Sequence, residues 1–168
     1  MLQAYLDILD YDGMKSVLKE AEMLKLKDAR DVDPNGTIDF YIFKKLIIAQ
    51  NSLLFGCYNL LYNLGMKLAI YLYPYGKSFQ DVVKEITELI KTDWDVQIVD
   101  QGVNSFTVKI QNCVFCYEIG VPCQLFIGFL VQSLKKSLPE NKNVTYESEI
   151  EKVSDLPQNS HILKLIWK

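Results

Sequence analysis

The stretch 94–110, WDVQIVDQGVNSFTVKI, decides the fold class. Apolar residues alternate with polar ones on both sides of Gly102, which is typical of a β-hairpin with one covered face. Before this stretch the apolar residues recur at helical spacing, so the period of the pattern changes here. The sequence therefore predicts a set of helices followed by an antiparallel sheet.

Four helices are expected before the hairpin. Asp12 is placed to cap the first, and the second covers residues 39–51. The third covers residues 53–73 and ends before Pro74, and the fourth begins at Ser78, which starts a capping-box variant. The third helix is apolar nearly all round, which predicts either a central position or an interface with a second subunit. We therefore expect a homodimer that forms through helices.

One more helix and two strands are expected after the hairpin. Pro122 suits the first turn of that helix, and Gly128 within it would allow close approach of another element. Strands are predicted over about residues 144–150 and 161–167. The predicted class is α+β, a helical core packed on a small four-stranded antiparallel sheet. We expect one small-molecule-binding domain over residues 1–168, with residues 1–52 as its less sharply defined helical part.

Composition excludes several classes of protein. The chain has 168 residues, with 49% hydrophobic and 23% charged residues, which is ordinary for a globular protein. Its net charge is -3, and no segment is both basic and aromatic, so a nucleic-acid partner is not expected. Polar residues interrupt the apolar region 46–75, which argues against a membrane span, and no secretory signal is visible. We expect a cytoplasmic protein with reduced cysteines.

Familiar catalytic signatures are mostly absent from the sequence. It contains no glycine-rich phosphate loop, no dinucleotide-binding fingerprint and no nucleophile elbow. The one histidine is His161, and nothing marks an orienting group for a cysteine–histidine pair. We expect no bound nucleotide, and binding is favoured over catalysis.

One group of residues has the spacing of a metal site. Cys113 and Cys116 form a C-x-x-C pair, and Cys123 and His161 could complete a tetrahedral shell. With four protein ligands such a zinc site would be closed and structural. The alternative is that these cysteines are small buried apolar residues and His161 an ordinary sheet residue. Cys57, within the apolar third helix, is most simply core.

Aromatic residues gather around the second and third helices. Phe55, Tyr58 and Tyr62 are close in sequence and could line a pocket for an apolar or aromatic ligand, with a phenol hydroxyl as a directional contact. The competing interpretation is an aromatic core or interface. The sequence alone leaves both open.

Several short sequence segments, and the order in which they occur, resemble those of the 4-vinyl reductase domain family and of the related subunits of transport protein particles. They cover about residues 53–167: YNLGMKL at 62–68, SFQDVV at 78–83, CVFC at 113–116, VPCQLFIGFL at 121–130, YESE at 146–149 and the closing strand. The resemblance implies a helix-mediated dimer that binds apolar or aromatic small molecules.

The resemblance also bears on cofactors. Relatives in phenol-sensing regulators bind zinc, and their ligands fall on Cys123, on Glu147 and close to His161. Their remaining cysteine falls on Ile150, which cannot ligate, so Cys113 and Cys116 would have to replace it. The haem-nitric-oxide branch needs a helix histidine and a Y-x-S-x-R motif. Residues 146–150 lack the arginine, so haem is not expected.

The leading hypothesis is a binding or sensing module for an apolar small molecule, with a structural zinc, that acts through partner proteins. One alternative is a reductase of tetrapyrrole vinyl groups, although no nucleotide-binding fingerprint supplies an electron donor. The other is a scaffold subunit like those of transport particles. The acylated cysteine of those subunits falls at about Gly76, so acylation is not expected.

Overall fold

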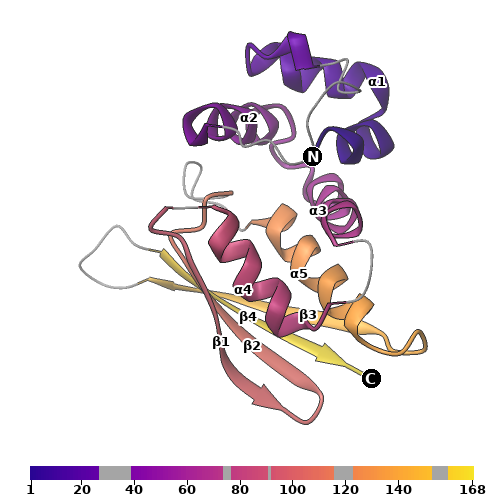
Figure 1. The fold of residues 1–168 in the computed structure, drawn as a ribbon, viewed down its shortest axis with the longest axis vertical. Coiled ribbons are helices and arrows are strands. Elements are labelled where there is room, and N and C mark those ends of the chain that lie inside the picture. The colour runs from indigo at the N-terminus through magenta and orange to yellow at the C-terminus, as the bar shows by residue number, and fades with distance from the viewer. Residues whose placement is uncertain (27–38, 74–76, 91, 116–122, 153–158) are drawn as a thin grey trace.

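The computed structural model describes residues 1–26, 39–73, 77–90, 92–115, 123–152 and 159–168. Within these ranges, five helices and four strands follow one another in the order α1–α4, β1, β2, α5, β3, β4 (Figure 1). The strands form one antiparallel sheet in the order β1-β2-β4-β3. The predicted α+β class with a four-stranded antiparallel sheet is confirmed.

The hairpin has the predicted form. β1 (Asp95–Gly102) and β2 (Ser105–Gln111) pair from Asp95 opposite Gln111 to Gly102 opposite Ser105. Phe106, Val108 and Ile110 are buried and alternate with half-buried residues. Because side chains alternate between the two faces of a strand, β2 places these three side chains on the face covered by helices.

The sheet is completed by β4 (Asn159–Trp167) beside β2 and by β3 (Val144–Lys152) at the outer edge. On β4, Leu163 and Leu165 are buried, opposite Val108 and Phe106 of β2. The inner faces of the two central strands therefore form one continuous apolar surface.

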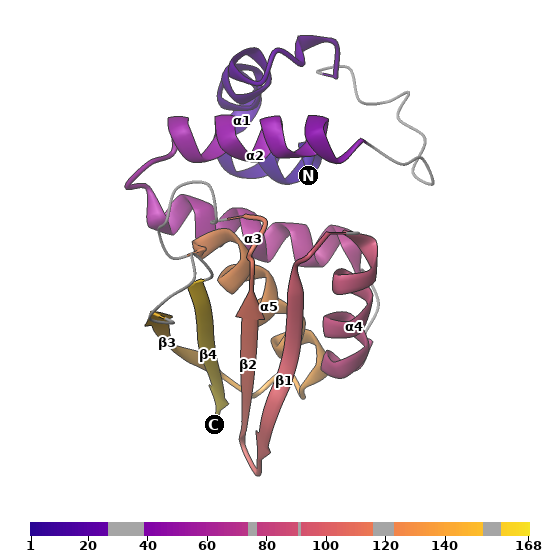
Figure 2. The same cartoon turned by 90° about the vertical axis from the view of Figure 1, so that its left-hand side faces the viewer.

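The central helix of the molecule is α5 (Gln124–Ser137). It lies on the inner face of the sheet, and α3 (Tyr58–Leu72) crosses its other side (Figure 2). Nine residues of α5 are buried: Leu125, Phe126, Ile127, Gly128, Phe129, Leu130, Val131, Ser133 and Leu134. The sequence pointed instead to the third helix as central or shared. In the structure α3 buries the side with Leu61, Leu64, Gly65 and Ala69 and exposes Leu60 and Ile70 on the other.

Two glycines allow α3 and α5 to cross closely. A Cβ on Gly65 of α3 would overlap the carbonyl oxygen of Leu125, and a Cβ on Gly128 of α5 would overlap that of Tyr62. No side chain larger than hydrogen fits at either position, because the two helices touch through their backbones. The close approach predicted at Gly128 is confirmed.

The remaining helices surround this pair. α4 (Phe79–Leu89) is capped by Ser78, whose Oγ accepts a hydrogen bond from the Asp81 N–H at 3.2 Å, as the capping-box variant predicts. α1 (Leu2–Glu20) and α2 (Phe40–Leu53) form a layer on the far side of α3 (Figures 1 and 2). Asp39 caps α2 by accepting hydrogen bonds from two backbone N–H groups.

Two helix boundaries differ from the prediction. α1 begins at Leu2 and breaks at Asp10, whose φ is 60°, and the Asp10 carboxylate accepts the Gly13 N–H at 3.0 Å. Asp10, rather than Asp12, therefore caps the second half of α1. Residues 54–57 separate α2 from α3, with Gly56 at a φ of 79°, so the helix expected from residue 53 begins at Tyr58. Within the described ranges, no helix has both the length and the apolarity to cross a membrane.

Candidate functional site around the N-terminal end of α5

Two of the residues singled out in the sequence, Cys123 and Tyr62, lie at or near the N-terminal end of α5. Cys123 is the N-cap residue of that helix and is buried. The next residue, Gln124, accepts a hydrogen bond through Oε1 from the Tyr146 hydroxyl of β3 at 3.3 Å. The Tyr146 ring in turn stacks on Tyr62 of α3, with 5.9 Å between ring centroids and 22° between the planes. One helix end, one strand and α3 therefore meet here through aromatic and polar contacts.

The three predicted ligand-binding residues extend from this junction toward the surface. Tyr62 is half-buried, whereas Tyr58, one helical turn earlier, is 46% exposed and Phe55 is 66% exposed. Burial, and to a smaller degree the nearby Tyr146, raises the pKa of the Tyr62 hydroxyl, which therefore remains a hydrogen-bond donor at neutral pH. We call these three residues, Phe55, Tyr58 and Tyr62, the aromatic ledge.

The expected zinc site is not supported. Cys113 lies just beyond β2 and is buried, and His161 on β4 is opposite Ile110 and is 9% exposed. Cys116 lies outside the described residues. Across the described residues, no three histidine, cysteine, aspartate or glutamate side chains form a group that could hold a metal ion. The described residues therefore give the predicted zinc no support.

Glu147, the alternative zinc ligand, lies on the wrong face of the sheet. Tyr146 beside it points toward α5, and neighbouring residues of a strand point to opposite faces. Glu147 is exposed and pairs in register with Lys164, which is also exposed. The prediction for Cys57 is also wrong, because this residue is an exposed N-cap of α3 and not core.

A buried polar chain links α1, α2 and the segment that follows β2. The Tyr5 hydroxyl donates to Gln50 Oε1 at 2.8 Å, the neighbouring Asn51 is buried as well, and Asn51 Nδ2 donates to the carbonyl oxygen of Phe115 at 2.8 Å. Burial raises the pKa of Tyr5. The sequence indicated that Gln50 and Asn51 are unusual, because these two polar residues interrupt an apolar run. It did not show which groups they contact.

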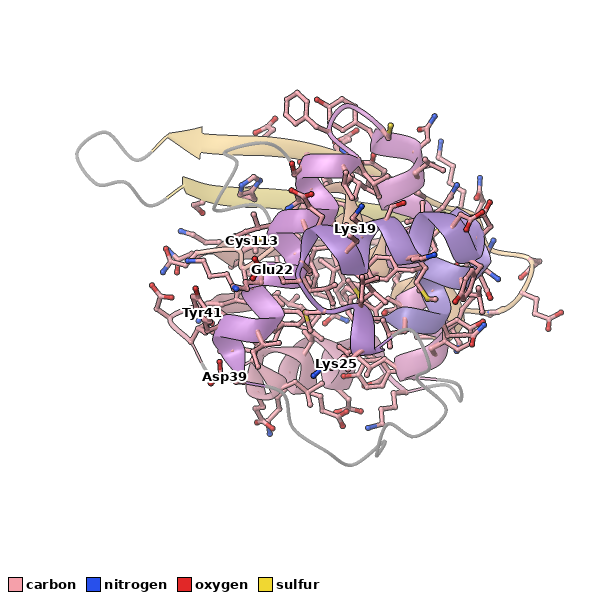
Figure 3. The ribbon with its side chains drawn as sticks, turned by 90° about the horizontal axis from the view of Figure 1, so that it is seen from above. Lys19, Glu22, Lys25, Asp39, Tyr41 and Cys113 are labelled. Atoms are coloured by element: carbon pink, nitrogen blue, oxygen red, sulfur yellow. The ribbon has the colours of Figure 1, made fainter. Side chains whose placement is uncertain are left out.

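Figure 3 looks down on the outer layer of helices. Glu22, just beyond α1, and Tyr41, at the start of α2, are both labelled in this layer. Lys45 connects them, because its Nζ lies 2.9 Å from Glu22 Oε2 and 5.5 Å from the centre of the Tyr41 ring. This outer ion pair is exposed and contributes little to stability.

The comparisons with known proteins bear on the fold. No protein-family model matches the chain, and no curated protein matches it. Among solved structures, an H-NOX chain from a study of haem distortion superposes with a TM-score of 0.63 at 14% identity, over 99% of this chain and 90% of that one. The fold is that of H-NOX domains. A structure described as an oxygen-binding H-NOX domain related to soluble guanylate cyclases gives a TM-score of 0.62 at 13% identity, with the same coverage.

The H-NOX fold corrects the cofactor prediction. We expected no haem, from a missing motif in residues 146–150. That prediction is contradicted, because the solved structures that share the fold include one studied for haem distortion. The resemblance to the 4-vinyl reductase domain is not shown by any comparison, whereas its relation to the haem-nitric-oxide branch agrees with the fold.

The chain's own residues fit a haem group only in part. Haem iron takes an axial donor such as a histidine nitrogen or a cysteine sulfur, and His161, Cys113 and Cys123 supply such atoms. The part of the described interior around Phe126, however, is filled with aromatic rings in contact. Phe126 lies 5.0 Å from Trp94, 5.5 Å from Phe115 and 5.7 Å from Phe129, measured between centroids. A porphyrin would not fit between these rings as they stand.

Proposed function

We propose that this chain is a small-molecule-sensing domain with no catalytic chemistry of its own, which acts through a partner protein. The observation that carries the proposal is the match to H-NOX domains, which extends over 99% of the chain and about nine-tenths of theirs. One of those domains is described as an oxygen complex, so the fold is compatible with binding a small molecule. The expected cytoplasmic location and the 4-vinyl reductase relationship belong to this proposal.

The proposed ligand surface is the aromatic ledge. Exposed rings such as Phe55 and Tyr58 lose contact with water when an apolar molecule covers them, which stabilises the complex. The Tyr62 hydroxyl would give the ligand one directional contact, as is usual in sites of this kind. We therefore propose an apolar or aromatic ligand, and hemin is included among the probes because the solved structures that share the fold include an H-NOX domain studied for its haem.

The proposal is tested by titrating the protein with hemin and with anilinonaphthalene sulfonate, followed by absorption and fluorescence. We expect saturable binding of at least one probe, and we expect Phe55→Ala to weaken it by about tenfold or more, since a buried aromatic side chain is worth about 1.5–3 kcal/mol. Tyr41→Ala is the matched control, because Tyr41 on α2 is 65% exposed and Phe55 is 66% exposed. If neither probe saturates, or if both variants weaken binding equally, the proposed ligand surface is wrong.

Homodimer formation is part of the same proposal. Side chains of α2 and α3 expose an unusual amount of apolar surface, and large exposed apolar patches mark interaction sites. The exposed members are Phe40, Tyr41, Ile42, Ile48, Leu53, Tyr58, Leu60, Ile70, Tyr71 and Leu72. A second copy of the chain would cover the side of α3 that carries Leu60 and Ile70, whereas Tyr58 is on the side of Tyr62 and belongs to the proposed ligand surface.

A further inference from the structure

The groove between α4 and β1 is the feature that the proposed function does not use. It is lined by Gln80, Val83, Lys84, Thr87 and Glu88 of α4 and by Val96, Gln97 and Ile98 of β1. The five α4 positions recur at helical spacing and form one stripe of that helix. The groove therefore runs along α4 and beside the strand.

The strand beside the groove is an edge strand. β1 is the first strand in the sheet order, and β2 occupies its other side. Along the free side of such a strand, backbone N–H and C=O groups are available to another strand. The register with β2 shifts between Ile98 and Asp100, so a regular edge extends over residues 95–98 and ends at the bulge.

The groove favours a partner strand in which apolar side chains alternate with polar ones. Val83 and Val96 are buried at its floor and Ile98 is half-buried, whereas Gln80, Lys84, Glu88 and Gln97 are exposed around it. A strand added to β1 would place every second side chain toward Val96 and Ile98, and the others toward Asp95 and Gln97. Apolar side chains suit the first set of positions.

The charges on β1 determine which partner side chains suit the second set of positions, those beside Asp95 and Gln97. β1 carries Asp95 and Asp100 and no basic residue, and within the groove Lys84 is balanced by Glu88. A second copy of β1 would bring its own Asp95 and Asp100 against these carboxylates, and like charges on paired strands are destabilising. Basic side chains are favoured instead.

We propose that the edge of β1 and the α4 groove bind an extended segment of a different protein, with alternating apolar and basic residues, by adding it to the sheet as a strand. This mode of binding uses main-chain hydrogen bonds for affinity and side-chain pockets for specificity. This inference depends on the proposed function in one respect: it names the kind of partner protein through which the domain would act.

The test is an NMR titration of the isotope-labelled 168-residue chain with a short blocked peptide of alternating valine and lysine. We expect shift changes confined to α4 and β1. Thr87→Arg should weaken binding at least about tenfold, because a long charged side chain would fill the groove wall against which the apolar side chains of the peptide would pack. Thr145→Arg, an exposed position on the opposite edge strand, is the matched control and should change nothing.

Two further peptides define the outcomes. A valine–glutamate peptide should bind more weakly, and a valine–lysine peptide methylated on alternate backbone nitrogens should lose binding, because it cannot complete the strand pairing. Equal binding of the methylated peptide, shift changes on β3, or no binding by any peptide would overturn the inference. Absence of hemin and dye binding together with intact peptide binding would instead overturn the proposed function alone.

Discussion

At the residue scale, the buried hydroxyl of Tyr5 connects α1 to α2. It donates to Gln50 Oε1 at 2.8 Å, and both residues have no exposed surface. Tyr5→Phe should lower the free energy of unfolding by about 1–3 kcal/mol, because it leaves a buried acceptor unsatisfied. Urea unfolding measures this change. Tyr41→Phe, at a largely exposed ring, should stay within about 0.5 kcal/mol of the unmodified protein. An equal loss in both variants would show that the buried hydrogen bond contributes nothing.

Asp7 makes the stability depend on acid pH. Its carboxylate accepts hydrogen bonds from the Tyr71 hydroxyl at 2.6 Å and from Gln3, and it lies 3.1 Å from Lys67 Nζ. These contacts, the Tyr71 bond first, lower the pKa of Asp7 from 3.8 to about 2. The folded state therefore holds this proton less tightly than the unfolded state does.

The stabilisation from Asp7 is present above pH 3.8 and is lost as the pH falls through about 2. In Asp7→Asn, the dependence of stability on pH should become flatter over this window, as measured by thermal unfolding at a series of pH values. Asp12→Asn on the exposed side of α1 serves as the control and should leave the slope unchanged. A slope that Asp7→Asn does not alter would mean that α1 and α3 are not linked through this carboxylate.

At the scale of elements, the crossing of α3 and α5 determines how the helices cover the sheet. A Cβ at Gly65 would lie 2.8 Å from the backbone nitrogen of Phe129 and would overlap the Leu125 carbonyl oxygen. Gly65→Ala should destabilise the protein by about 3 kcal/mol, because backbone on both helices must move apart. Asn63→Ala, on the exposed side of the same helix, should change stability by less than about 0.5 kcal/mol. Calorimetric unfolding of both variants tests the close crossing directly.

The sequence predicts elements well where a local pattern determines them. The period of the hairpin, the start of α2 near residue 39 and the Ser78 cap of α4 are properties of neighbouring residues. The start of α3 was missed because apolar residues continue across the turn at Gly56. The central position of α5 was missed because burial depends on which helix crosses the sheet, and no local pattern reports that.

The candidate site, too, could be predicted from the sequence only where neighbouring residues determine it. Cysteines at the ends of elements could be recognised one by one, but whether they meet depends on how β2, α5 and β4 are arranged. Glu147 illustrates the limit, since a shift of one residue along a strand moves a side chain to the opposite face. Gln50 and Asn51 were visible as polar interruptions, yet their partners Tyr5 and Phe115 are distant in sequence.

At the scale of the whole molecule, we expect two chains to associate through α3. Light scattering after gel filtration should give twice the 19.4 kDa of one chain. The double variant Leu60→Glu and Ile70→Glu should give the single-chain mass, because two carboxylates would be brought into an apolar interface. Val103→Glu, at the 95% exposed hairpin turn, should remain a dimer. A single-chain mass for the unmodified protein would contradict the predicted dimer.

The central claim, that the chain senses a small molecule, is tested most directly by native mass spectrometry of the purified 168-residue chain, before and after incubation with hemin and anilinonaphthalene sulfonate. The account predicts a noncovalent mass increment on the folded chain that disappears on denaturation and is reduced in Phe55→Ala but not in Tyr41→Ala. A bare polypeptide mass under every one of these conditions would contradict it.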